Sequence, residues 1–313
     1  MDGGMATQLE AKGIQLHSEL WSAYELISHP EFIEDIHYAY LESGANIITT
    51  NSYQVSLLGF KKIGLEEGAV KELLRKSVDL AVSAKERYLK NTASPQRPIF
   101  VAGSVGPYGA HLNDGSEYKG EYAAALSEQE IIEYHLPRIE VFLNHPGVDI
   151  ILCETFPSLR EASVLVSAIS TLTPKKPIFV SFTVKHVGDS LLISNGEDFF
   201  DAFKVFEQFE QVLAIGVNCV SSLVVSDLLD LIKKRGILNK STKKIIVYPN
   251  VYAWNATTKT WIISQAPSTS PEELVSSWFD SGASIIGGCC STGPQHIHLF
   301  SQILKLKLSN QNQ

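Results

Sequence analysis

The chain has 313 residues, of which 44% are hydrophobic, and a formal net charge of -8. This length and composition suffice for a large buried core, and the acidic balance with unclustered basic residues argues against a nucleic-acid partner. No apolar run approaches the roughly 20 residues of a membrane-spanning helix, and the first residues lack the pattern of a signal peptide, so we expect a cytoplasmic protein with no membrane partner.

Seven short runs of apolar, often β-branched residues are predicted to be strands. Each run is nearly continuous in apolar residues, which is typical of parallel strands buried on both faces. They cover residues 45–50, 98–105, 148–155, 177–183, 212–219, 244–250 and 284–290.

Helical patterns lie between these strands. Ser127 is followed three residues later by Glu130, the pattern of a capping box at a helix start. Ser270 with Pro271 directly after it predicts a second helix start, and Gly282 marks the end of that helix.

Alternating strands and helices are shared by doubly wound sheets and (β/α)8 barrels. Residues 103–109 (GSVGPYG) do not match the G-x-G-x-x-G fingerprint of a nucleotide-binding sheet, which favours the barrel. We expect one TIM-type barrel domain over residues 1–313. An eighth strand would have to precede Asp2, so we expect the first strand to be missing or truncated at the N-terminus, with a gap between two unpaired sheet edges.

Three of the four cysteines follow predicted strands, at the barrel end where active sites lie. Cys219 ends one strand, and Cys289 and Cys290 end the last. Gly287 and Gly288 are expected to let the backbone leave strand geometry so that both adjacent thiols reach one point. Three thiolates with an open fourth position are typical of a catalytic zinc site. Buried apolar cysteine and a strained disulfide are the alternatives.

Two neighbouring residues end the third run. Cys153 and Glu154 must point to opposite sides of a strand, and we expect Glu154 to face the barrel mouth while Cys153 packs in the core. A surface position or an ion pair is the alternative for Glu154. The long polar loop 107–122 is predicted to be a lid or a substrate loop.

Six segments together resemble one family. They are DGGMATQLE, ANIITTNSYQ, GSVGPYGAHLNDGSEYKGEY, CETFPS, GVNC and IIGGCC, and they resemble the zinc-dependent homocysteine S-methyltransferases over nearly the whole chain. The resemblance implies a (β/α)8 barrel and a Zn²⁺ ion held by Cys219, Cys289 and Cys290, with the homocysteine sulfur at the fourth position.

The resemblance also implies a substrate site. Asp2 and Glu154 match the acidic residues that hold the substrate ammonium, and the backbone amides around Gly3 and Gly4 would face its carboxylate. Asn218, next to the first metal ligand, completes the predicted substrate-binding set.

The methyl donor follows from the branch that the chain resembles. Its GSEYKGEY loop is similar to that of the S-methylmethionine-using enzymes, and Thr155 stands where the betaine-using branch has tyrosine. The expected small-molecule partners are therefore homocysteine and S-methylmethionine, with S-adenosylmethionine as a second donor.

Three alternatives stay open. The first is a homocysteine-binding module that receives its methyl group from a cobalamin or folate protein. The second is a non-catalytic zinc- or thiol-binding barrel, disabled because loss of the first strand leaves Asp2 on a free terminus. The third is a redox role for Cys289 and Cys290. Selenocysteine in place of homocysteine as the acceptor is a close variant of the main hypothesis.

Overall fold

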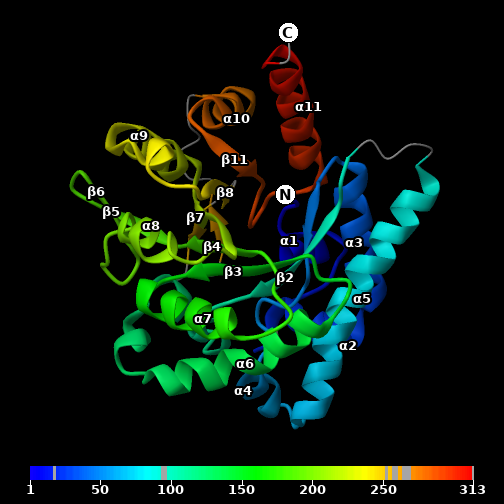
Figure 1. Ribbon diagram of the computed structural model, residues 1–313. Coiled ribbons are helices and arrows are strands. Elements are labelled where there is room, and N and C mark those ends of the chain that lie inside the picture. Colours follow the sequence, from blue (N-terminus) through cyan, green and yellow to red (C-terminus); the bar gives the residue numbers. More distant parts are fainter. Residues whose placement is uncertain (17–18, 93–96, 251–252, 256–259, 263–268, 312–313) are drawn as a thin grey trace.

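A curled parallel sheet forms the centre of the computed structural model, which describes residues 1–313 except 17–18, 93–96, 251–252, 256–259, 263–268 and 312–313 (Figure 1). Its seven strands lie in chain order and every neighbouring pair is parallel. They are β1 (Ile47–Thr49), β2 (Phe100–Val105), β3 (Ile150–Phe156), β4 (Ile178–Phe182), β7 (Val212–Ser221), β8 (Lys244–Asn250) and β11 (Ala283–Ile286). The seven predicted strands are confirmed, although the last ends earlier than expected.

Helices connect these strands and cover the outer face of the sheet (Figure 1). The α-helices are α1 (Met5–Ala11), α2 (Glu25–Ser28), α3 (Pro30–Glu42), α4 (Leu57–Lys61), α5 (Glu67–Asn91), α6 (Glu128–Asn144), α7 (Leu159–Thr171), α8 (Asp201–Phe206), α9 (Ser222–Arg235), α10 (Pro271–Asp280) and α11 (Pro294–Gln311). The predicted capping box at Ser127 and the predicted helix start at Ser270 are both present, and each serine exchanges hydrogen bonds with the glutamate three residues on. Among the described residues, no helix combines the length and apolar composition that a bilayer span demands.

Short elements lie in the connections between the longer helices and strands. Single turns of 3-10 helix occur at η1 (Trp21–Tyr24), η2 (Tyr108–His111), η3 (Ser116–Tyr118), η4 (Glu121–Ala124) and η5 (Ile237–Asn239). Two hairpins, which the apolar patterns did not predict, pair β5 (Val184–Val187) with β6 (Ser190–Ile193) and β9 (Ala253–Asn255) with β10 (Thr260–Ile262).

The core has two layers, one on each face of the sheet. The larger layer lies between the sheet and the helices, and the smaller lies inside the curl of the sheet. Strand β3 shows how one sequence serves both: Ile150 and Leu152 belong to the inner layer, whereas Ile151 and Cys153 belong to the outer one. This alternation turns the next residue, Glu154, toward the inside.

The sheet does not close, because β1 and β11, as far as the chain is described, do not pair with each other. Met1 and Asp2 bridge the gap at its upper end. The N–H of Asp2 donates to Ile47 O at 2.9 Å, its carbonyl accepts from Gly288 N at 3.0 Å, and the Met1 amine donates to Ile286 O at 2.7 Å. The expectation of a gap is confirmed. The expectation that Asp2 sits on a loose terminus is wrong, because its backbone bonds to Ile47 in β1 and to Gly288 just after β11.

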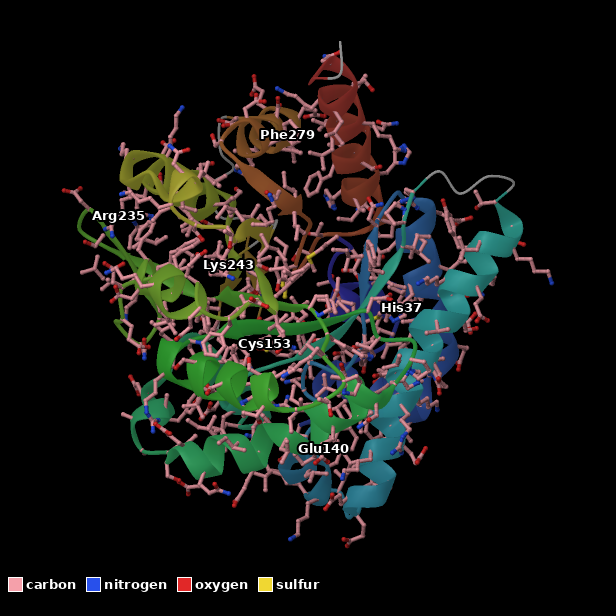
Figure 2. The ribbon with its side chains drawn as sticks, in the orientation of Figure 1. His37, Glu140, Cys153, Arg235, Lys243 and Phe279 are labelled. Atoms are coloured by element: carbon pink, nitrogen blue, oxygen red, sulfur yellow. The ribbon has the colours of Figure 1, made fainter. Side chains whose placement is uncertain are left out.

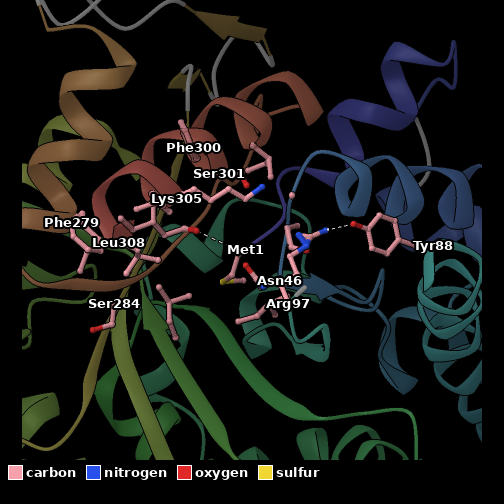
Figure 3. A pocket seen from close by; sticks show the side chains of 18 of the residues that line it. Met1, Asn46, Tyr88, Arg97, Phe279, Ser284, Phe300, Ser301, Lys305 and Leu308 are labelled. Carbon is pink, nitrogen blue, oxygen red and sulfur yellow. Dashed lines mark hydrogen bonds between the residues drawn. The ribbon is translucent and has the colours of Figure 1, made fainter. Parts of the chain in front are cut away.

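A cavity of about 760 Å³ lies in this gap next to Met1 (Figure 3). The ends of the two edge strands line it, together with residues of α11 such as Phe300 and Leu304. Arg97 crosses one wall and donates to the hydroxyl of Tyr88 at 3.1 Å. Met1 and Asp2 therefore close one end of the gap, and the cavity lies beside them between the two edge strands.

Candidate active site

Three of the four cysteines meet at the mouth of the curled sheet. Cys219 lies near the end of β7, and Cys289 and Cys290 lie in the loop after β11. Their Sγ atoms all lie within 4.8 Å of one another, and those of Cys219 and Cys289 are 2.6 Å apart. The fourth, Cys153, is fully buried between the sheet and the helices, and burial raises its pKa to about 12 (Figure 2). The sequence prediction that separates these two kinds of cysteine is confirmed.

Cys219 and the two glycines before Cys289 each have a special backbone role. Cys219 has a φ of 53°, a left-handed conformation that non-glycine residues adopt rarely and mainly at functional sites. Gly287 and Gly288 do not have positive φ angles. They are needed for space, since a Cβ would lie 2.5 Å from Met1 Cβ at Gly287 and 2.0 Å from Thr292 Cγ2 at Gly288. The strand ends at Ile286, so the chain leaves strand geometry at these glycines as predicted, and they also allow a close approach that the sequence did not predict.

The three thiols are electrostatically unequal. Hydrogen bonds from Cys219 and then Cys290 hold the pKa of Cys289 well below its usual value. The pKa of Cys219 is raised, first by its hydrogen bond to Cys289 and then by its bond to Cys290. One thiolate is therefore favoured and further ionisation is opposed. A bound dication reverses that opposition, and three sulfur donors beside a cavity fit a soft metal ion with one open position.

Two buried carboxyl groups line the same cavity as the cysteines. Asp2 is 4% exposed and accepts hydrogen bonds from Thr49 N at 2.6 Å and Thr49 Oγ1 at 2.9 Å. Glu154 is 8% exposed and accepts from the hydroxyl of Ser104. Burial raises the pKa of Asp2 to about 7, and burial followed by the Cys289 charge raises that of Glu154 to about 8. Both groups suit a cationic partner, which would restore the ionised form.

The remaining predicted substrate residues take different positions. Gly3 and Gly4 line the cavity, but the N–H of Gly4 donates to Thr292 O at 2.9 Å and is not available to a ligand. Asn218 is fully buried, and its amide is occupied by Thr155 and Ser181. Asn218 therefore links the end of β7 to Thr155 on β3 across the intervening strand β4, and its amide nitrogen also lies 4.0 Å from the Cys289 sulfur.

The loop over residues 107–122 reaches the cavity, as the lid prediction implies. Glu117 and Tyr118 line it from this loop, and Trp21 and Tyr53 line it from the opposite side. The sequence reasoning did not single out these four residues. Tyr53 follows β1 in the segment TTNSYQ, where a strand-end position could have signalled it; Trp21 carried no signal except its type.

A buried carboxylate anchors that loop. Glu161 on α7 accepts from Tyr108 N at 2.6 Å and from the Tyr122 hydroxyl at 2.6 Å. It also pairs with His135 on α6 at 2.9 Å, and Arg138 contacts the other ring nitrogen of this histidine at 2.6 Å. Both ends of the loop are therefore tied to the helix layer.

Comparisons with known proteins agree on one family. The family model described as homocysteine S-methyltransferase matches residues 1–304. Homocysteine S-methyltransferase YbgG of Bacillus subtilis is 38% identical over 301 residues, which cover 95% of this chain and 91% of that protein. Selenocysteine methyltransferase of Astragalus bisulcatus is 35% identical over 318 residues, which cover 96% and 91%.

A solved structure gives the same result. The metallated form of the homocysteine methyltransferase MmuM from Escherichia coli has a TM-score of 0.81 and 35% identity, with 96% of this chain and 94% of that chain covered. The oxidized form of MmuM has the same TM-score of 0.81, whereas the apo form has 0.71. The present structure is therefore less similar to the apo form than to the other two.

Proposed function

The chain belongs to the homocysteine S-methyltransferase family, and from this premise we propose that it transfers a methyl group from a sulfonium donor to the sulfur of homocysteine. The observation that carries the proposal is the cavity shared by three cysteine sulfurs and two buried carboxyl groups. The first set suits a metal that activates a thiol, and the second suits the ammonium of an amino acid.

We propose that Cys219, Cys289 and Cys290 hold Zn²⁺. Their convergence at the cavity and the similarity to a relative with a metallated form support this assignment. When bound, the ion would favour the thiolate form of homocysteine, which is the nucleophilic form and is scarce at neutral pH for a free thiol.

Asp2 and Glu154 would hold the homocysteine ammonium between them. Each carboxylate is already fixed by a hydrogen bond from its neighbour, so neither has to reorganise when substrate arrives. The amide of Gly3 lies at the rim of the cavity and has no acceptor among the described residues, so it is the candidate donor to the substrate carboxylate. The three cysteines line the same cavity as these groups, so the substrate sulfur would lie within reach of them.

Methyl transfer then needs a donor opposite the acceptor sulfur. The thiolate attacks the methyl carbon, the bond from that carbon to the sulfonium sulfur breaks, and the donor leaves as a neutral thioether. We propose S-methylmethionine as the donor, with S-adenosylmethionine second; the first would yield two methionines per turnover. The charge of -8 on the chain favours such a cationic donor over an anionic one.

A selenol is a second acceptor candidate. The similarity to a selenocysteine methyltransferase supports it, because that relative covers nearly the whole chain. A disabled, non-catalytic barrel finds less support, since the hydrogen bonds of Asp2 remove the loose terminus on which that alternative depended.

The test combines turnover with metal analysis. Zinc-loaded protein is mixed with homocysteine and, separately, S-methylmethionine, S-adenosylmethionine or betaine, and methionine is measured by chromatography. Cys290→Ala is expected to lose both bound zinc and product, whereas Cys153→Ala, which removes the buried thiol outside the cluster, should keep both. Zinc-loaded wild type that forms no methionine from any donor would refute the proposed activity.

A further inference from the structure

Glu117 is a half-buried carboxylate that the acceptor site described above does not use. It lies in η3 on the loop after β2, and its Oε2 atom is shielded from solvent. No described residue donates a hydrogen bond to that oxygen. Asp2 and Glu154, by contrast, each accept from a neighbouring hydroxyl. A buried acceptor without a donor is costly, so Glu117 has a position that only a ligand would satisfy.

Two tyrosines line the same cavity as Glu117 and the cysteines. Tyr53 and Tyr118 line the cavity together with Glu117 and Cys219. Burial, followed by the charges of Glu117 and Cys219, raises the pKa of Tyr53 well above its usual value. Tyr118 lines the cavity as well, although its side chain is 41% exposed. Both rings and the Glu117 carboxylate therefore lie around the cavity that the cysteine cluster also lines.

The backbone around Glu117 is fixed. Its carbonyl accepts from Thr183 Oγ1 at 3.4 Å, at the end of β4. A Cβ at Gly109 would lie 2.7 Å from Glu117 N, which shows how closely the loop packs on itself. With Tyr122 bonded to Glu161, the loop holds Glu117 in place before any ligand binds.

The ligand that fits this wall is a cation without hydrogen-bond donors. A sulfonium sulfur carries full positive charge but no N–H or O–H, so it is stabilised by a nearby carboxylate and by aromatic rings rather than by hydrogen bonds. An ammonium, in contrast, would be expected to meet several acceptors, as it does between Asp2 and Glu154.

We propose that Glu117, with Tyr53 and Tyr118, forms the subsite for the sulfonium cation of the methyl donor, so that Glu117 selects charged donors over neutral ones. This inference rests on the proposed methyl transfer. Burial raises the pKa of Glu117 to about 7, and a bound cation would return it to the ionised form.

The charge of the donor changes during the reaction, which gives the role a kinetic signature. The sulfonium is cationic at the start and a neutral thioether at the end, so a carboxylate beside it stabilises the bound donor more than the transition state. Its loss should therefore raise the KM for the donor and leave kcat unchanged or higher.

The experiment compares Glu117→Gln with Glu121→Gln, which removes an exposed carboxylate from the same loop. We measure kcat and KM for S-methylmethionine and KM for homocysteine in the zinc-loaded protein. We also measure the Ki of 2-amino-5-methylhexanoic acid, in which a CH group replaces the sulfonium sulfur and the charge is lost. Glu117→Gln should raise the KM for S-methylmethionine about 30-fold. Its KM for homocysteine and its Ki for the neutral analogue should not change, and Glu121→Gln should match wild type.

An unchanged KM for S-methylmethionine in Glu117→Gln would overturn the inference and leave the proposed function intact. An equal rise in the KM for S-methylmethionine and in the Ki of the neutral analogue would also overturn it, because the substitution would then act through the shape of the site and not through its charge. If wild type transfers no methyl group, the proposed function fails. Calorimetric titration of S-methylmethionine into wild type and Glu117→Gln then decides the subsite separately, with equal affinities contradicting it.

Discussion

Glu154→Gln offers a test of the ammonium site that does not depend on turnover. Methionine is the ligand, because it shares the ammonium and carboxylate of homocysteine but has no thiol to titrate. The pKa of Glu154 is about 8, so the ionised fraction falls about 50-fold between pH 8 and pH 6. Wild-type affinity for methionine should fall by more than that factor over this range, because the Asp2 carboxylate becomes protonated as well. The variant should bind weakly at pH 8 and keep only the shallower pH dependence due to Asp2, whose pKa is about 7.

Stability serves as the control for this variant. The pKa of Glu154 is raised from its ordinary value of 4.5 to about 8, so the folded state loses stability as the pH rises through that window. The loss amounts to about 5 kcal/mol when the shift is converted at about 1.4 kcal/mol per pH unit. Glutamine has no proton to lose, so the variant should unfold no more easily than wild type at pH 9 in urea.

Calorimetric titration with methionine at pH 6, 7 and 8 provides the measurement, on both proteins without metal and under reducing conditions. Parallel pH profiles for wild type and Glu154→Gln would refute the reasoning, because the carboxylate would then not contact the ammonium. A flat profile in both proteins would refute the role of Asp2 as well.

Two further predictions concern stability. His37 on α3 is fully buried, neither ring nitrogen has a partner among the described residues, and burial lowers its pKa to about 3 (Figure 2). The folded state should therefore lose up to about 5 kcal/mol as the pH falls from 6.5 to 3, and His37→Leu should flatten this decline in urea unfolding; equal slopes would contradict it. Four apolar residues added before Met1 should fill the cavity between β1 and β11, bury two or more side chains and raise stability by about 2 kcal/mol. An added Gly-Ser-Gly-Ser segment is the control, and an equal melting temperature for both extensions would exclude filling of the gap.

Much of the fold was predictable because its signals are local. Each parallel strand is buried on both faces and so reads as a continuous apolar run, and each capping box is written within four residues. The opposite directions of Cys153 and Glu154 follow from the two-residue period of a strand. Chain-order pairing then brings the cysteine-bearing strand ends to one rim.

The features that sequence reasoning missed depend on distant contacts. Asp2 is fixed by partners 45 and 286 residues away, and no local pattern encodes such a register. Gly287 leaves the space that Met1 occupies, and Met1 lies at the other end of the chain. Asn218 was placed at the substrate because it adjoins a cysteine, yet a strand alternates its sides, and its amide bonds to Thr155 on β3, two strands away in the sheet.

Met1 and Asp2 close the gap between β1 and β11, and the same two residues line the cavity that holds the cysteines. A ligand that holds the Asp2 carboxylate also holds the two edges together, because that residue bonds to Ile47 on one side and Gly288 on the other. At a ligand concentration of about 100 times Kd, mass action adds about 2.7 kcal/mol to the folded state. The substrate concentration would then set how often the gap between β1 and β11 opens. Opening in the ligand-free protein would expose two strand edges to neighbouring chains.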